Sequence, residues 1–558
     1  MVGIDISHKA LQAAIGDKLT VKEIEDLLFT IGFEVDGVDG DLLKVEVTPD
    51  RLDALSTQGL ARVIKAYLHK KSGQRAYETK KSTKFDVHVD PSVAQVRPYT
   101  VCAVVDGLKL NDDLLKDIIG VQEKLHASFA KQRKKAAIGI YPMEHITWPI
   151  TFCAKRPADI SFRPLGSASK MSASQILLEH PAGKAYAHLL SGKSHYPLFT
   201  DSKDVVLSMP PIINSEECGR VTTKTKSVFI EVSGFDQKPL AYILTLLSCI
   251  FIDMGATVHT VTVHYGKKKN ITPQLASESR SISVKKVNEV TGLDITSSQL
   301  ALMLEKMHHK VKSKSATAVT IEVAPFRSDI WHDVDIIDDV VRAVGINNIK
   351  PRVPTVATTG HILPQTRFID NIRLNLVGQD MQEIMTLAVT DKVDQFEKMG
   401  VQATHQVNLG STAERSINML RSWLLPESLK VLANNKDAPH PIRIFEIGDV
   451  VVSDESADVR SKNVCKVCIS LCSEGVTFTD IKQSVEALFA VLGFTCTFKA
   501  VEHNSFIKGR CAEVIVNNRH CGMLGEVTPS VLVNWGLEYP VATAELFVDQ
   551  LFIEFKKR

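Results

Sequence analysis

The sequence has no apolar run long enough to cross a membrane. A spanning helix needs about 20 apolar residues, and the longest run here, from Leu240 to Met254, is interrupted by Ser248 and Asp253. The N-terminus also lacks the basic start and apolar stretch of a secretory signal. We therefore expect a cytoplasmic protein with no membrane partner.

A strong overall charge is missing as well. Lysine and arginine total 66 and aspartate and glutamate 64, so the net charge is only +2. No general field would therefore attract a nucleic acid. A local patch could still do so, and basic residues cluster between Lys65 and Lys84. A solvated linker between domains is the alternative that we favour for this segment.

Cysteines in paired motifs are also scarce. The ten cysteines are scattered, as expected for reduced thiols in a cytoplasm. Cys465 and Cys468 have the spacing of a metal-binding pair, but no second pair follows at zinc-finger spacing. Because both lie in the strand-like run 464–471, we interpret them as small buried hydrophobic residues.

The overall composition is that of a folded protein with several hydrophobic cores. The 558 residues correspond to about four domains at ~150 residues each. Hydrophobic residues make up 44% and charged residues 23%, as in ordinary globular proteins. Composition shifts and turn signals place the predicted domains at residues 1–84, 85–270, 271–355 and 356–558.

Local patterns predict both helices and strands. Thr20 and Glu23 have the spacing of a capping box, so a helix should begin there and end at Gly32. Residues 43–47 alternate like a half-buried strand. Strands and helices alternate in the second predicted domain, and strands dominate the second half of the last. The predicted fold class is α+β with several domains.

The acidic run that begins at Asp329 carries the strongest chemical signal. Apolar residues from Ile336 to Val344 form one stripe of a helix. Asp335, Asp338 and Asp339 have the spacing of one helical face. With Asp329 they could form an all-oxygen site for Mg²⁺. The alternative is that these carboxylates stabilise the first turns of the helix through its dipole.

Residues 326–349 also resemble a known family. They are similar to the magnesium-binding domain of phenylalanyl-tRNA synthetase beta subunits of the archaeal and eukaryotic cytosolic type. The resemblance implies that Asp329, Asp335, Asp338 and Asp339 bind Mg²⁺, although the family commonly has Glu at the position of Asp338. Residues 47–62 resemble the first domain of the same subunit.

Residues 208–215 and 228–236 resemble the domain that hydrolyses mischarged tyrosyl-tRNA in that family. An editing pocket must accept the additional phenolic hydroxyl of tyrosine by hydrogen bonding. The candidates are Asn214, Ser215, Glu231, Ser233 and Asp236. The alternative is a proline-rich turn beside a core strand. The sequence shows no spacing of a protein nucleophile, so we expect water to attack the ester, activated by the hydroxyls of the substrate.

The last 200 or so residues resemble an antiparallel-sheet module with the topology of an inactive class II aminoacyl-tRNA synthetase catalytic domain. The resemblance rests on residues 378–386, 420–426, 444–448 and 508–529. The glycine-rich segment with a terminal arginine that active modules contain is missing, and no phosphate-binding loop replaces it. We therefore interpret Arg421 and Arg510 as structural or interface residues rather than ATP ligands.

The resemblance implies a catalytic partner. We expect a heterotetramer of two alpha and two beta chains that attaches phenylalanine to tRNA(Phe), with ATP and phenylalanine bound on the alpha subunit. This chain would supply the interface, tRNA contacts and the editing domain. Two alternatives remain, namely a tRNA-binding scaffold without enzymatic activity and a deacylase that acts without an alpha chain.

Overall fold

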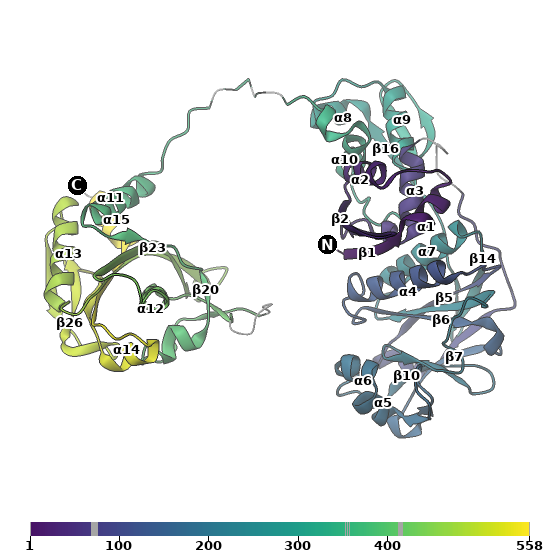
Figure 1. The fold of residues 1–558 in the computed structure, drawn as a ribbon, viewed down its shortest axis with the longest axis horizontal. Coiled ribbons are helices and arrows are strands. Elements are labelled where there is room, and N and C mark those ends of the chain that lie inside the picture. The colour runs from purple at the N-terminus through teal and green to yellow at the C-terminus, as the bar shows by residue number, and fades with distance from the viewer. Residues whose placement is uncertain are drawn as a thin grey trace. The chain divides into compact units, whose positions relative to one another are not determined.

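The computed structural model describes residues 2–68, 76–351, 353, 355–356, 358–410 and 417–556. The chain forms two compact units, Met1–Pro354 and Thr355–Arg558, shown in Figure 1. The centre of the basic segment, residues 69–75, lies outside the described residues. Across the described part of the chain, no helix is both long and apolar enough to span a bilayer.

The N-terminal unit begins with a small α/β subdomain. Its sheet is antiparallel with the order β1-β3-β2. As predicted, α2 begins at a capping box of Thr20 and Glu23 and ends at Gly32, whose φ of 100° suits glycine. The elements are β1 (Val2–Ser7), α1 (His8–Ile15), α2 (Val21–Ile31), β2 (Glu34–Asp39), β3 (Leu42–Val47) and α3 (Thr57–Tyr67).

A ten-stranded mixed sheet forms the middle of this unit. Its order is β12-β11-β10-β7-β4-β14-β5-β13-β6, with β15 paired to β14. The apolar helix α7 (Gln237–Asp253) packs on β5 and β13, and α4 (Asp112–Ala127) contacts β6. The strands are β4 (Asp86–Val89), β5 (Tyr99–Asp106), β6 (Ala136–Pro142), β7 (Ile150–Lys155), β10 (Tyr196–Thr200), β11 (Val206–Met209), β12 (Ile213–Asn214), β13 (Ser227–Gly234), β14 (Thr257–Tyr265) and β15 (Lys268–Thr272).

Short elements and a third subdomain complete the unit. A hairpin, β8 (Ser161–Phe162) with β9 (Met171–Ser172), leads into α5 (Ala173–Glu179) and α6 (Pro181–Tyr186). The third subdomain has an antiparallel sheet with the order β16-β18-β17. Its elements are β16 (Glu278–Ser283), α8 (Val284–Thr291), α9 (Ser297–Lys306), β17 (Lys310–Lys314), β18 (Ala318–Val323) and α10 (Asp333–Val344).

A buried cluster of arginine–aspartate pairs joins these subdomains. Arg62 of α3 donates to Asp253 of α7 at 2.6 Å. Arg327 donates to Asp329 at 2.6 Å and to Asp339 of α10 at 2.8 Å. Although burial by itself acts to raise it, the pKa of Asp339 is held well below its ordinary value by Arg327. The guanidinium of Arg62 also lies 3.7 Å from the centre of the Phe326 ring, next to Arg327 in the sequence. Buried charges of this kind need their partners, so the cluster holds α3 and α7 against the segment that precedes α10.

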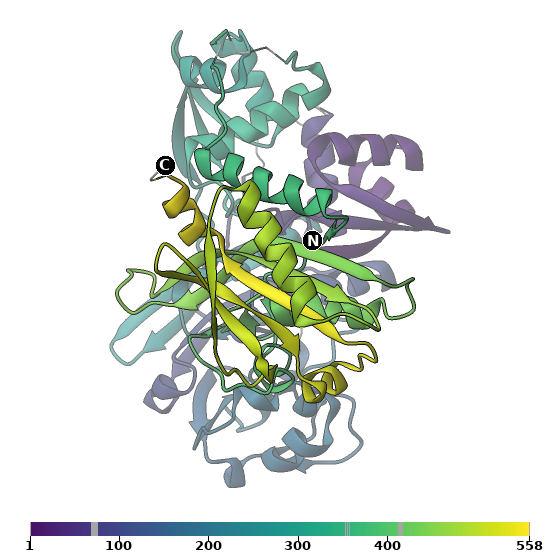
Figure 2. The same cartoon turned by 90° about the vertical axis from the view of Figure 1, so that its left-hand side faces the viewer.

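The C-terminal unit is built on a seven-stranded sheet. The order is β19-β23-β24-β28-β27-β26-β25, antiparallel except between β19 and β23. Figure 2 shows the yellow-green helix α13 (Phe478–Val491) across one face of this sheet. The strands are β19 (Gln382–Glu383), β23 (Ile442–Ser453), β24 (Ser461–Cys472), β25 (Cys496–Ala500), β26 (Phe506–Val516), β27 (Arg519–Val527) and β28 (Val541–Phe547).

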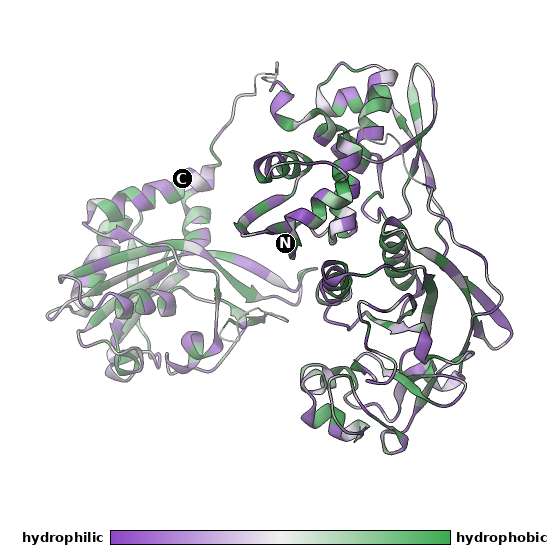
Figure 3. Cartoon of the chain, turned by 45° about the vertical axis from the view of Figure 1, so that its right-hand side comes forward, coloured by the Kyte–Doolittle hydropathy of each residue, from purple (hydrophilic) through white to green (hydrophobic). Residues whose placement is uncertain are grey.

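The remaining elements cover this sheet. They are α11 (Pro364–Gly378), α12 (Leu425–Asn434), α14 (Pro529–Trp535), α15 (Val548–Lys556) and the small sheet β20 (Val389–Thr390), β22 (Met419–Leu420) and β21 (Val407–Asn408). Green and purple residues alternate along many helices in Figure 3, the pattern of amphipathic helices. Cys465 and Cys468 of β24 are buried, as predicted. The predicted α+β multidomain class is confirmed.

Removing one arginine of the cluster should destabilise the N-terminal unit strongly. Arg327→Met keeps an apolar stem but leaves Asp329 and Asp339 without their cation, and we expect a loss of about 3–5 kcal/mol in the free energy of unfolding. Arg156→Met is the matched control because its ion pair with Asp159 is exposed, and should cost less than about 1 kcal/mol. Urea unfolding measures both, and equal losses would contradict a special role for the cluster.

Candidate functional site

A cavity of about 490 Å³ opens in the N-terminal unit beside β13. This volume is within the usual range of small-molecule sites. Its walls come from α4, β6, β13 and the hairpin of β11 and β12. The apolar lining includes Leu115, Ile118, Ile119, Ala137, Ile138, Ile140, Pro210, Pro211, Ile212 and Ile213, and the polar lining Gln122, Glu123, His126, Arg133, Ser208, Asn214, Arg220 and Glu231.

Glu231 is the buried carboxyl group of this cavity. It lies in the middle of β13, paired across the sheet with Cys102 of β5 and Gly139 of β6. A Cβ at position 139 would lie 2.0 Å from Tyr141 Oη and 2.7 Å from Glu231 Oε1. Glycine is therefore needed beside the carboxyl group, since any larger residue would displace these polar atoms.

The hydrogen bonding of Glu231 is incomplete. Tyr141 Oη lies 2.7 Å from Ser208 Oγ and 3.2 Å from Glu231 Oε1, and its single proton can be donated to only one of them at a time. Glu231 Oε2 is buried and has no hydrogen-bond partner among the described residues. Such an atom costs free energy unless a ligand or water satisfies it.

Burial also sets the protonation state of Glu231. It raises the pKa of this carboxyl group to about 8, although Arg97 acts in the opposite direction. At neutral pH the group is therefore mostly a neutral acid, which can donate one hydrogen bond and accept others. A ligand hydroxyl, which both donates and accepts, is complementary to it.

Asn214 reaches the same cavity from β12. It pairs with Ser208 of β11, so the residues on either side of Pro210 and Pro211 face each other across a hairpin. A Cβ on Gly219 would lie 2.5 Å from Asn214 Cβ, so this position also requires glycine. The sequence prediction therefore placed two of its five candidates, Asn214 and Glu231, in one cavity.

The other three candidates lie outside the lining of the cavity. Ser215 is buried, and its Oγ accepts from Cys218 N at 3.2 Å. Ser233 Oγ accepts from the buried Arg97 at 3.1 Å. Asp236 is exposed and caps α7 by accepting from Lys238 N. Each therefore has a structural role in this chain.

Sequence reasoning missed the wall that α4 supplies. Gln122 and His126 are one helical turn apart and both line the cavity, as does Arg133 after the helix. Ile138 N donates to His126 Nε2 at 2.8 Å, so the ring proton is on Nδ1. Burial lowers the pKa of His126. The i, i+4 spacing of two polar residues in an otherwise apolar helical face was the available signal.

The four predicted metal ligands have protein partners. Asp329 and Asp339 share Arg327, and Asp338 pairs with Arg342 at 2.8 Å. Asp335 accepts from the backbone of Trp331 and His332 at 2.7 and 2.6 Å, which caps α10. Carboxylates engaged in this way do not fit an ion held by all four within this chain. The magnesium site stays a prediction.

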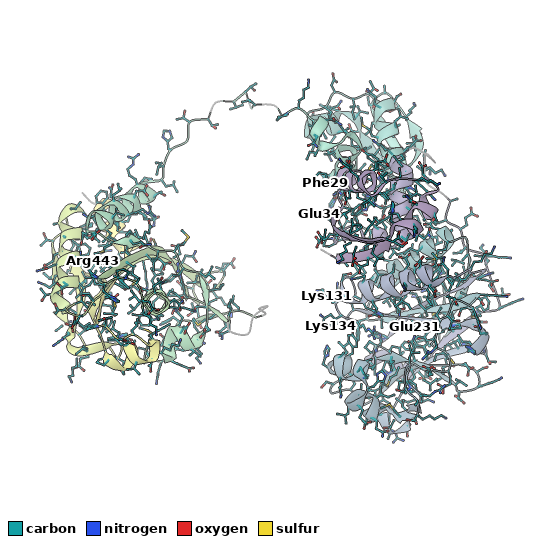
Figure 4. All side chains as sticks on the ribbon, viewed as in Figure 1. Phe29, Glu34, Lys131, Lys134, Glu231 and Arg443 are labelled. Carbon is teal, nitrogen blue, oxygen red and sulfur yellow. The ribbon has the colours of Figure 1, made fainter. Side chains whose placement is uncertain are left out.

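A different set of acidic residues has its carboxylate oxygens close together. Within the described ranges, the one group of three potential ligands whose atoms lie within 4.8 Å is Glu34, Asp36 and Glu46, on β2 and β3. Glu34 is labelled in Figure 4. Exposed acidic groups of this kind are common on sheets without any ion, so we assign it no function.

The two arginines of the C-terminal unit have carboxylate partners. Arg421 is buried and donates to Glu446 at 2.6 Å. Arg510 donates to Glu526 at 2.5 Å. Both guanidinium groups are therefore engaged within the protein, in agreement with the structural role predicted for them.

Comparison with known proteins identifies the family. Three family descriptions match the chain: "Phe-tRNA synthetase beta subunit B1 domain" over residues 1–70, "tRNA synthetase B5 domain" over 280–346, and "Phenylalanyl tRNA synthetase beta chain CLM domain" over 349–548. They define a subunit of an aminoacyl-tRNA synthetase.

Full-length relatives narrow this class. The phenylalanine–tRNA ligase beta subunit of Pyrococcus horikoshii is 37% identical over 557 residues, which cover 99% of this chain and all of the relative. That of Methanocella arvoryzae is 33% identical with the same coverage. The chain belongs to the family of phenylalanine–tRNA ligase beta subunits.

A solved structure agrees with this assignment. An N-terminal fragment of the phenylalanyl-tRNA synthetase beta subunit from Pyrococcus horikoshii matches with a TM-score of 0.59 and 35% identity. The match covers 61% of this chain and 99% of the fragment. The recognition of the family from sequence motifs is confirmed.

The pKa of Glu231 predicts a pH-dependent stability. The folded chain binds this proton more tightly than the unfolded chain, so the contribution of Glu231 to the free energy of unfolding is fully present below its ordinary pKa of 4.5 and is lost as the pH rises to about 8. The expected slope is about 1.4 kcal/mol per pH unit between about pH 5 and pH 8. Glu231→Gln removes the titration, so urea unfolding should show a difference between the two proteins that changes with pH.

The role of Asp335 can be decided with magnesium titrations. As a helix cap, Asp335→Asn should cost about 0.5–1 kcal/mol, and added Mg²⁺ should shift the melting temperature of both proteins equally. Asp333→Asn, in the same helical turn but outside the predicted ligand set, is the control. A stabilisation by Mg²⁺ that disappears only in Asp335→Asn would instead establish the metal site.

Proposed function

We propose that this chain acts with an alpha subunit as phenylalanine–tRNA ligase and that its cavity hydrolyses tyrosine from mischarged tRNA(Phe). The incompletely bonded, neutral carboxyl group of Glu231 in an otherwise apolar cavity is the observation that supports the second part. The editing domain in this proposal is the predicted domain 85–270.

The chemistry of the cavity favours an aromatic ligand with a hydroxyl group. The isoleucine and proline walls suit an aromatic ring, and Glu231, Ser208 and Asn214 offer hydrogen bonds. A phenolic hydroxyl could satisfy Glu231 Oε2, whereas phenylalanine would leave it unpaired at a cost of about 1–3 kcal/mol. The correct product is therefore rejected because the site contains polar groups that it cannot satisfy.

The cavity offers no activated protein nucleophile among its described lining residues. Ser208 Oγ accepts from Tyr141, and His126 Nε2 accepts from Ile138 N. Neither is paired with the other as a nucleophile and base would be. We propose that water attacks the ester, activated by the hydroxyls of the terminal ribose. The protein residues bind and orient the tyrosyl group.

The C-terminal unit has a different role in the proposal. Its antiparallel sheet, together with arginines engaged by Glu446 and Glu526, supports an inactive class II catalytic module that holds the alpha subunit. ATP, phenylalanine and Mg²⁺ would bind on the alpha chain of an assembly with two alpha and two beta chains, in the cytoplasm. For the aspartates of this chain to take an ion, they would have to leave Arg327 and the cap of α10.

Deacylation of Tyr-tRNA(Phe) by the complex with alpha tests the editing proposal. Glu231→Ala should lower kcat/KM for this hydrolysis by about 10- to 100-fold, the equivalent of about 1.4–2.7 kcal/mol. Charging with phenylalanine should require both chains and should be unchanged in the variant.

Asp236→Asn is the matched control for that measurement. It keeps the helix cap but removes the charge of a candidate that the structure places outside the cavity lining, and hydrolysis should match the wild-type rate. Loss of hydrolysis in Asp236→Asn with full activity in Glu231→Ala would contradict the proposed site. Hydrolysis by this chain without alpha, and no complex with alpha, would favour the free deacylase.

A further inference from the structure

The turn that follows α4 has an unusual backbone. Lys131, Gln132 and Arg133 have φ angles of 49°, 52° and 65°, in a left-handed region that residues with a side chain rarely occupy in succession. Backbone hydrogen bonds hold this conformation, including Lys135 N to Ala130 O at 2.9 Å and Arg133 N to His126 O at 3.2 Å. Backbone of this kind persists where the surrounding structure requires it, often beside functional sites.

Arg133 fastens this turn to the wall of the cavity. Its Nη1 donates to the carbonyl oxygen of Ile212 at 2.9 Å, its Nη2 donates to Glu123 at 3.1 Å, and its guanidinium lies 4.2 Å from the centre of the Tyr186 ring. Arg133 itself lines the cavity. The turn therefore has a fixed position at the edge of the site.

The neighbouring lysines have a different environment from Arg133. Lys131 and Lys134 are exposed, and in Figure 4 they lie at the outer edge of the unit, with Glu231 further inside at a similar height. No carboxylate among the described residues lies within ion-pair distance of either ammonium group. By contrast, the exposed Arg220 of the cavity lining pairs with Glu216 at 2.9 Å.

We propose that Lys131 and Lys134 bind phosphates of the single-stranded acceptor end of tRNA and so guide the terminal aminoacyl-adenosine into the cavity. This inference rests on the proposed editing function. The ester is carried on the last nucleotide, so the preceding phosphates must lie at the edge of the cavity when the ester is inside. Lysine ammonium groups bind phosphates as point charges without reading the sequence.

The left-handed turn explains why both lysines are available. Arg133 is directed inwards to Ile212 and Glu123, whereas residues 131 and 134 on either side of it are exposed. Because the backbone of the turn is held by its own hydrogen bonds, binding of RNA does not have to order it, which lowers the entropic cost of binding. These lysines are binding residues and take no part in the hydrolysis itself.

The double variant Lys131→Ala/Lys134→Ala tests the proposal in the complex with alpha. KM for Tyr-tRNA(Phe) deacylation should rise about tenfold at low salt while kcat stays within about twofold, because two phosphate contacts are lost. The slope of log KM against log salt should fall by about 1.4, at ~0.7 per single-stranded contact. Hydrolysis of tyrosyl-adenosine, which has no phosphate, should be unchanged.

Lys267→Ala/Lys268→Ala is the matched control. It removes the same charge from the β14–β15 turn, which contributes no described residue to the cavity, and should leave KM and the salt slope as in the wild type. A wild-type KM and slope in the Lys131/Lys134 variant, or an equal change in both double variants, would overturn the proposal.

A second measurement separates this inference from the editing proposal. If the wild-type complex does not hydrolyse Tyr-tRNA(Phe), the editing proposal fails. Binding of an uncharged acceptor-stem minihelix then tests the phosphate contacts of the two lysines independently of editing. Fluorescence anisotropy should show weaker binding and a smaller salt slope in Lys131→Ala/Lys134→Ala than in the lysine control. Equal binding by the two variants would reject the phosphate contacts.

Discussion

The N-terminal unit depends on oppositely charged side chains that are buried in contact with each other. Arg62 and Asp253 join helices that are 191 positions apart in the sequence, and Arg327 binds Asp329 before α10 and Asp339 within it. Each buried ion would be costly alone, so the pairs specify one arrangement of the subdomains. The cluster also includes α7, which packs on β5 and β13. The strand that carries Glu231 is thereby joined to the same framework.

Glu231 differs from these buried carboxylates in its protonation. Asp339 remains ionised because Arg327 contacts it, whereas Glu231 has no comparable contact with a cation, and burial raises its pKa to about 8. The first carboxyl group stabilises the fold, and the second leaves an oxygen for a ligand. The two carboxyl groups therefore differ in protonation because Asp339 forms an ion pair with Arg327, whereas burial dominates at Glu231.

The candidate site was only partly predictable from the sequence. Asn214 and Glu231 were identified because their segments resemble a known family, but Ser215, Ser233 and Asp236 belong to the same segments and lie outside the cavity lining. Ser233 shares a face of β13 with Glu231, but its Oγ accepts a hydrogen bond from Arg97, which is 136 positions away. The sequence did not show that partner. Helical spacing places Gln122 and His126 on one face of α4, but only the packing of α4 against β6 shows that this face borders the cavity.

The sequence by itself determined the family, the α+β class and many local elements, such as the capped helix from Val21 to Ile31, because caps, periodicity and turn residues act over a few positions. Only the tertiary structure decided the partners of the acidic run and the protonation of Glu231. Asp329 and Asp339 both pair with Arg327, and the burial of Glu231 depends on residues far away in the chain. Long-range packing sets the local dielectric and brings cations next to carboxyl groups. Neither effect can be read from a short sequence motif.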